Sequence, residues 1–312
     1  MYCPEITPQA LSQSVIAVPP LARDDDYRLN RDGNRKILAH LSQGGVRTVL
    51  YGGNANLYNM AVSEFGELLD LLEDVAPSDT WIIPSVGPDF GKAMDQIAIL
   101  RDRDFPTAML LPLVFPATSS GVATGLRRLA ERYGRPMTAY IKSQDYITPA
   151  DLAALVADGV VCSVKYANVR KDPDDDPYLA ELVANIDTGR VVSGIGERPA
   201  ISHLNGFGLN GFTSGSVCIA PALSTALLAA LKAGRLEAAA ALRANFLPLE
   251  DLRDNHSPLR VLHAAVATAE IAETGPLLPF LNNLVAPGLL AEIGAASRTL
   301  LAADAAHMAA TA

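Results

Sequence analysis

The chain has 312 residues, of which 49% are hydrophobic, and a formal net charge of −9 at pH 7. This length suits one large α/β domain or two small ones, and the hydrophobic content excludes an intrinsically disordered chain. The acidic balance argues against nucleic acid or an anionic membrane as a partner, since both require a basic surface. The first ten residues, MYCPEITPQA, lack the basic n-region of a signal peptide, so we expect a cytoplasmic protein.

Short apolar runs alternate with amphipathic stretches along most of the chain. The runs predict eight strands, at Ser14–Val18, Thr48–Tyr51, Trp81–Val86, Thr107–Leu113, Met137–Lys142, Val160–Lys165, Arg190–Ile195 and Gly211–Thr213. The stretches between them predict helices that include Arg31–Gln43, Ala61–Asp74, Lys92–Arg101, Val122–Tyr133, Pro149–Ala157 and Tyr178–Asn185. Two of these helices have strong start signals, because a capping Thr148 or Asp176 precedes a proline.

Eight strands that alternate with helices indicate a parallel sheet, and the number eight favours a closed (β/α)8 barrel. The alternative is an open doubly wound sheet, which would need a glycine-rich phosphate loop after the first strand. The chain has Val18-Pro19-Pro20-Leu21 there instead. Beyond residue 235 only helices are predicted, at Glu237–Phe246, Leu259–Ala272 and Pro287–Leu301. We therefore expect a catalytic barrel over residues 1–235 and a helical region over 236–312.

Active sites of such barrels lie where the strands end, and one strand end here is a lysine. Lys165 follows the apolar run Val160–Val164 and is one of six lysines in the chain. A lysine buried at a strand end is costly unless it is paired or its pKa falls until it is neutral. A neutral amine in a pocket forms Schiff bases with ketones. The alternative for Lys165 is an ammonium that extends to solvent or pairs with a carboxylate.

Two further strand ends carry groups that Schiff-base chemistry needs. Tyr140, on the strand before Lys165, could shuttle protons if an electropositive site lowers its pKa; otherwise it is a core aromatic. The turn Gly52-Gly53-Asn54 allows close backbone approach, and its free N–H groups could hold a carboxylate; otherwise it is only a tight turn. Together these residues predict an amine nucleophile, an acid/base and a carboxylate site at one mouth of the barrel.

This pattern resembles the dihydrodipicolinate synthase/N-acetylneuraminate lyase family, and the resemblance covers nearly the whole chain. Its strongest passages are TVLYGGNANLYNMAVSEF (Thr48–Phe65), MTAYIKSQDYITPADLAAL (Met137–Leu155) and VVCSVKYAN (Val160–Asn168). The family comprises class I aldolases and dehydratases on a (β/α)8 barrel with a helical C-terminal region. The resemblance implies that Lys165 forms the Schiff base with a 2-oxo acid such as pyruvate and that Tyr140 shuttles the proton. It also implies a homo-oligomer, a homotetramer or homodimer.

The resemblance further implies which residues bind substrate. The turn after the second strand would hold the 2-oxo acid carboxylate, and the loops after the seventh and eighth strands would line the pocket. The residues expected to bind substrate are Gly53, Asn54, Ala55, Lys142, Gly194, Thr213 and Ser214. No metal ion and no organic cofactor is expected, because the lysine itself supplies the electron sink.

Departures from the family pattern bear on the substrate. The family turn usually reads GTTGE or GGTGE, whereas this chain has GGNAN, so Asn54 offers a carboxamide in place of a hydroxyl. Pro112 is not followed by the family's tyrosine pair, and the short segment after Tyr140 lacks the family's substrate-binding arginine. A three-membered hydroxyl relay is therefore not expected, and the chain is not expected to be dihydrodipicolinate synthase itself. The GG turn and the short loop after Tyr140 are closer to the 5-dehydro-4-deoxyglucarate dehydratase branch. In that branch Lys142 would contact a distal carboxylate of a sugar acid. The alternative is that Lys142 is a solvated loop lysine.

The sequence therefore predicts a Schiff-base lyase, an aldolase or a dehydratase, that acts on pyruvate or a sugar-derived 2-oxo acid. A second hypothesis is a degenerate member that binds a 2-oxo acid without turnover, which the altered turn motivates. A third is a metal-dependent barrel aldolase, for which only Glu197 stands at a strand end.

Overall fold

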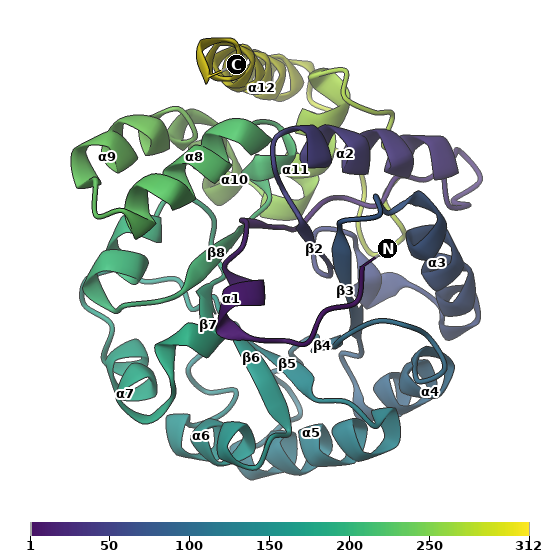
Figure 1. Ribbon diagram of the computed structural model, residues 1–312. Coiled ribbons are helices and arrows are strands. Elements are labelled where there is room, and N and C mark those ends of the chain that lie inside the picture. Colours follow the sequence, from purple (N-terminus) through teal and green to yellow (C-terminus); the bar gives the residue numbers. More distant parts are fainter. Residues whose placement is uncertain (1, 312) are drawn as a thin grey trace.

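Eight parallel strands form a closed barrel in the order β1 to β8 in the computed structural model, which describes residues 2–311. The strands are β1 (Ile16–Ala17), β2 (Thr48–Tyr51), β3 (Trp81–Val86), β4 (Met109–Leu110), β5 (Met137–Ile141), β6 (Val161–Tyr166), β7 (Val191–Ser193) and β8 (Gly211–Ser214). Figure 1 looks along the barrel axis and shows the helices as a ring around the strands. The (β/α)8 prediction is confirmed, and the doubly wound sheet is not found.

The helices of the ring follow the strands in order. A short α1 (Pro8–Leu11) precedes β1, and the ring consists of α2 (Arg31–Gln43), α3 (Val62–Val75), α4 (Phe90–Leu100), α5 (Ser119–Tyr133), α6 (Pro149–Ala157), α7 (Pro177–Asn185) and α8 (Pro221–Lys232). Single turns lie at η1 (Leu57–Asn59), η2 (Thr188–Arg190), η3 (Ser202–Gly206) and η4 (Ser216–Cys218). The bounds predicted for α2 and α6 are those observed.

The predicted helix-start signals make the expected caps. Thr148 Oγ1 accepts a hydrogen bond from the backbone N–H of Asp151 at the start of α6. Asp176 accepts one from the N–H of Leu179 at the start of α7. Each cap satisfies a donor that the first helical turn leaves without a backbone partner, which typically contributes about 1 kcal/mol.

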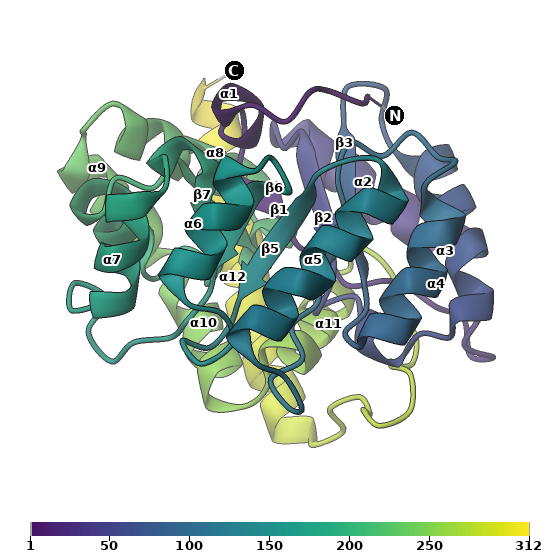
Figure 2. The same cartoon turned by 90° about the horizontal axis from the view of Figure 1, so that it is seen from below.

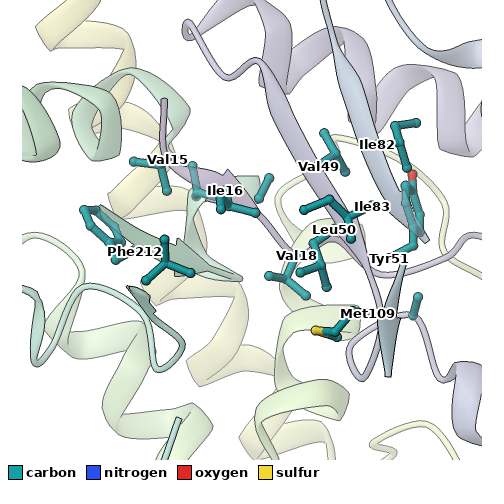
Figure 3. Close-up of a cluster of buried hydrophobic side chains, with 14 of the residues drawn as sticks. Val15, Ile16, Val18, Val49, Leu50, Tyr51, Ile82, Ile83, Met109 and Phe212 are labelled. Atoms are coloured by element: carbon teal, nitrogen blue, oxygen red, sulfur yellow. The ribbon is translucent and has the colours of Figure 1, made fainter. Parts of the chain in front are cut away.

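Apolar side chains pack continuously from strand to strand in the core, and buried hydroxyls such as those of Thr138 and Ser163 lie among them. Figure 3 shows buried side chains of β1, β2, β3 and β8, with Ile16, Leu50, Ile83 and Phe212 among them. Each such side chain, when fully buried, contributes about 1.5–3 kcal/mol through the hydrophobic effect. The barrel is therefore a packed core, and an open cavity is to be sought at its mouths.

Four strands are shorter than predicted: β1, β4, β5 and β7. β1 was expected over Ser14–Val18 and β4 over Thr107–Leu113, but each keeps only two residues in the ladder. Prolines limit the C-terminal ends of both strands, since Pro19 follows β1 and Pro112 follows β4, and proline has no N–H to donate.

The helices beyond α8 carry the part of the fold that the sequence predicted least well. They are α9 (Leu236–Ala244), α10 (Leu247–Asn255), α11 (Pro258–Thr268) and α12 (Pro287–Thr311). No helix was predicted over α10, and α11 ends before the predicted Ala272. Figure 2 shows α10 and α11 at one end of the barrel and α1 at the other. None of the helices within residues 2–311 has the length and apolarity that crossing a membrane requires.

Candidate active site

A cavity of about 370 Å³ lies at the carboxyl ends of the strands. Seven of the residues predicted for the site line it: Gly53, Asn54, Tyr140, Lys142, Lys165, Gly194 and Thr213. The other lining residues come from the ends of β1, β6, β7 and β8, from η1, and from α10, α11 and the loops beside them. Gly53 and Thr213 are 160 positions apart in the sequence, and closure of the barrel brings both to one cavity.

Lys165 lies near the end of β6 and is only 4% exposed. No hydrogen bond or ion pair reaches its Nζ from residues 2–311, and the atom stands 4.5 Å from the centroid of the Tyr140 ring. Burial lowers the pKa of Lys165 to about 7, with further lowering by the positive charges of Lys142 and Arg253. At neutral pH a large fraction of this amine is therefore unprotonated, which is the state that attacks a carbonyl.

Tyr140 faces Lys165 because β5 and β6 pair in register at these two residues. Burial raises the pKa of Tyr140 to about 12. The condition set for a proton shuttle, a pKa lowered by an electropositive site, is not met in the free protein, because removal from water raises the pKa of Tyr140. The hydroxyl therefore keeps its proton at neutral pH and is available as a proton donor.

Gly194 follows β7 and gives the lysine its room. A Cβ at this position would stand 2.9 Å from Cγ of Lys165, 2.7 Å from Cβ of Ala167 and 2.8 Å from the carbonyl oxygen of Tyr166. Any larger residue would have to displace β6 or the lysine itself. Glycine at position 194 is therefore a requirement of the packing around Lys165.

The turn after β2 lies at the mouth of the barrel, but its residues differ in position. Gly53 and Asn54 line the cavity, whereas Ala55 is buried and is not among the lining residues. Asn54 Nδ2 donates a hydrogen bond of 2.8 Å to the carbonyl of Val18, at the end of β1. This bond holds the carboxamide against β1 and leaves the second N–H of the amide for another acceptor.

The two residues predicted after β8 also separate. Thr213 lines the cavity, whereas Ser214 is buried outside it. Ser214 Oγ donates to a carboxylate oxygen of Glu197 at 2.7 Å and accepts from the N–H of Val217. Ser214 thus holds the loops after β7 and β8 together, whereas Thr213 faces the cavity.

Tyr58 is a lining residue that the sequence analysis missed. It lies on η1 and lines the same cavity as Tyr140. Burial raises the pKa of Tyr58, and the neighbouring Tyr140 and Tyr146 raise it further. A second phenolic hydroxyl therefore stands in the neighbourhood of Tyr140. Its position four residues after Asn54, within one short helical turn, is the signal that could have identified it.

Arg253 and Glu250 were also missed, because both lie on α10, the helix that was not predicted. Both line the cavity and both are buried. The backbone N–H of Glu197 donates to Glu250 Oε1 at 3.0 Å, which ties α10 to the loop after β7. Burial, and next the charge of Glu197, raise the pKa of Glu250 well above its ordinary value. Within residues 2–311 no group of three or more His, Cys, Asp or Glu side chains is placed to hold a metal ion.

Comparison with known proteins bears on the fold. No family model matches the chain, and no curated protein matches it in sequence. Solved structures do: the dihydrodipicolinate synthase from Bacillus clausii is 20% identical with a TM-score of 0.78, covering 94% of this chain and 98% of that chain. The chain has the fold of these synthases. The one from Oceanobacillus iheyensis is 18% identical with a TM-score of 0.80 at the same coverage.

A further similar structure holds a ligand. YagE, a prophage protein from E. coli K12 belonging to the dihydrodipicolinic acid synthase family, was solved in complex with pyruvate. It is 15% identical to this chain with a TM-score of 0.79, covering 92% of this chain and 98% of that chain. At these identities the likeness establishes the barrel with its C-terminal helices, and the chemistry has to be argued from the site.

Proposed function

We propose that this chain is a lyase of the dihydrodipicolinate synthase/N-acetylneuraminate lyase family that forms a Schiff base between Lys165 and a 2-oxo acid. The observation that carries the proposal is the buried lysine of lowered pKa, which stands unpaired in a cavity beside a protonated tyrosine. The pyruvate bound to the similar YagE protein supports a 2-oxo acid as the substrate class.

The proposed reaction starts with the neutral amine. Lys165 Nζ attacks the ketone carbon, the C–N bond forms, and one proton passes from the nitrogen to the former carbonyl oxygen, which becomes the hydroxyl of a neutral carbinolamine. Tyr140 donates its proton to that hydroxyl, which leaves as water, and the lone pair on nitrogen completes the iminium. The resulting tyrosinate lies beside the positive iminium and can later remove a proton from the substrate. The iminium then accepts the electron pair released by C–C cleavage or by loss of a proton before β-elimination.

For the finer class we propose the dehydratase-like branch. The GG opening of the turn after β2 and the short loop after Tyr140 favour it. Lys142 lines the cavity at an exposed position of the mouth, where its ammonium could meet a distal carboxylate of a sugar acid. We also propose a homotetramer or homodimer, which light scattering would test.

The experiment is reductive trapping with borohydride. Pyruvate and a panel of sugar-derived 2-oxo acids are each incubated with the protein, and peptide mass spectrometry locates any adduct. An adduct on the peptide that carries Lys165, absent from Lys165→Ala and present in the matched control Lys36→Ala, is expected. No adduct with any member of the panel would contradict the proposal. An adduct without turnover would favour the binding protein over the lyase.

A further inference from the structure

Arg253 on α10 is a buried cation, and no carboxylate oxygen of residues 2–311 lies within hydrogen-bond distance of it. The residue is 8% exposed. Its Nη1 donates to Ser216 Oγ at 3.1 Å, and its Nε makes a long contact of 3.5 Å with the carbonyl of Pro258. The carboxylate oxygen that pairs with it, Oε1 of Glu250, is 3.8 Å away, which is beyond hydrogen-bond distance. Its Nη2 has no hydrogen-bond partner within residues 2–311.

The acidic groups near Arg253 are occupied elsewhere. Glu197 accepts hydrogen bonds of 2.7 Å from the hydroxyls of Ser214 and Ser224, one on each carboxylate oxygen. Burial first, and the charge of Glu197 second, raise the pKa of Glu250 well above its ordinary value, which weakens Glu250 as an anionic partner of the guanidinium. Within residues 2–311 neither carboxyl group makes a hydrogen bond to Arg253. A buried guanidinium left in this state is costly until an anion reaches it.

The side chains of Asn54 and Arg253 both approach the backbone of Gly215. A Cβ on Gly215 would stand 2.9 Å from Arg253 Nη2 and 2.9 Å from Asn54 Nδ2. Two atoms that each lie 2.9 Å from one point are at most about 6 Å apart, a span that the two oxygens of one carboxylate bridge. All three residues line the cavity of Lys165. Glycine at position 215 keeps the space between the two donors free of a side chain.

We propose that Arg253 Nη2 and Asn54 Nδ2 together bind the carboxylate of the 2-oxo acid whose carbonyl reacts with Lys165. The inference rests on the proposed function and assigns a binding residue that lies outside the barrel strands. It also orients the substrate, because Asn54 and Gly215 lie beside β1, while Lys142 follows β5 on the opposite side of the closed barrel. The carboxylate of the oxo acid lies on the β1 side, and the rest of the chain extends toward Lys142.

Pyruvate and methyl pyruvate separate this role from a structural one. They carry the same ketone, but only pyruvate carries the anion. We expect Arg253→Gln to lower the rate of borohydride trapping by about 10- to 100-fold for pyruvate and to leave that for methyl pyruvate within about twofold. Arg253→Lys keeps the charge and loses the forked geometry of the guanidinium, so its trapping rate for pyruvate should lie between those of Arg253→Gln and the wild type. Arg243→Gln, on α9 and outside the cavity, is the matched control and should behave as the wild type.

The ratio of the two rates within one preparation does not depend on how much of that preparation is folded. Equal losses for both ketones, or no loss for either, would overturn the role of Arg253. A separate measurement removes the covalent step: pyruvate should raise the Tm of Lys165→Ala, and should not raise that of Lys165→Ala with Arg253→Gln. If trapping fails in the wild type and this difference in Tm persists, the Schiff base is wrong and the carboxylate site stands. If trapping succeeds and the difference is absent, the carboxylate site is wrong.

Discussion

The barrel strands and helix α10 contribute to one cavity in different ways. Tyr140 and Lys165 are placed by backbone register, since β5 and β6 pair at these two residues and each is next to the end of its strand. Arg253 and Glu250 are placed by side-chain and loop contacts, with Ser216 and with the backbone of Glu197. The comparison predicts that the strands carry the chemistry and that α10 contributes to substrate binding.

The largest effect is expected on the strand side, at Tyr140. Tyr140→Phe keeps the ring beside Lys165 and removes the proton donor, so the trapping rate should fall by about 10²- to 10⁴-fold. Tyr133→Phe removes a buried hydroxyl that donates to the carbonyl of Phe105, far from the cavity, and serves as the control. A trapping rate in Tyr140→Phe that equals the control would show that the proton comes from another group, for which Tyr58 is the candidate.

Burial of Lys165 should be visible as a cost in stability. The unfolded chain holds this proton up to about pH 10.4, whereas the folded chain holds it only up to a pKa of about 7. The unfolded state therefore binds more protons between these values, and the stability contributed at this site rises with pH across that window. Lys165→Met should raise the free energy of unfolding by up to about 4 kcal/mol at pH 7, and the gain should vanish near pH 10.5.

Chemical denaturation at pH 6, 7, 9 and 10.5 measures this gain, and the exposed Lys36→Met is the control. A gain in the free energy of unfolding that does not depend on pH would mean that burial does not lower the pKa of Lys165.

A substitution at Gly194 tests how rigidly β6 is held around Lys165. Gly194→Ala places a Cβ within 3 Å of atoms of Lys165, Tyr166 and Ala167, one of them backbone. We expect a loss of about 1–3 kcal/mol in the free energy of unfolding, together with slower trapping of pyruvate and methyl pyruvate alike. Gly288→Ala, where nothing lies within 4 Å, is the control. Unchanged stability in Gly194→Ala would show that β6 moves more easily than its register suggests.

The smallest effect is expected at Glu250, on the helix side. Because burial raises the pKa of Glu250 well above its ordinary value, the neutral Glu250→Gln should change the free energy of unfolding by less than about 1 kcal/mol at pH 7. Glu197→Gln alters the two carboxylate oxygens that accept hydrogen bonds from the hydroxyls of Ser214 and Ser224, and should cost more. The reverse order in thermal or chemical denaturation would mean that the carboxyl group of Glu250 is ionised, and Arg253 would then face a negative charge.

The same contrast explains how much the sequence could predict. Apolar runs and capping residues are local, so the strand ends at Tyr140 and Lys165 and the bounds of α2 and α6 could be predicted from the chain alone. α10 could not, because its leucines alternate with charged residues and a proline, and its acidic and basic side chains resemble those of a solvated helix. The burial of Arg253 becomes visible only when α10 lies against the barrel.

The sizes of the pKa shifts in the site could not be predicted from the sequence either. The pKa of Tyr140 depends on how far burial removes the hydroxyl from water, which no spacing along the chain reports. The pKa of Lys165 could be anticipated in direction, because an ammonium at the end of an apolar strand has few ways to remain charged.

The most direct test of the central claim is the pH dependence of borohydride trapping of pyruvate at Lys165. If the neutral amine of Lys165 is the nucleophile, the trapping rate should rise with pH and level off with a midpoint near the pKa of about 7. A rate that keeps rising to about pH 10, as for an ordinary lysine, would contradict the account. So would an adduct on any lysine other than Lys165.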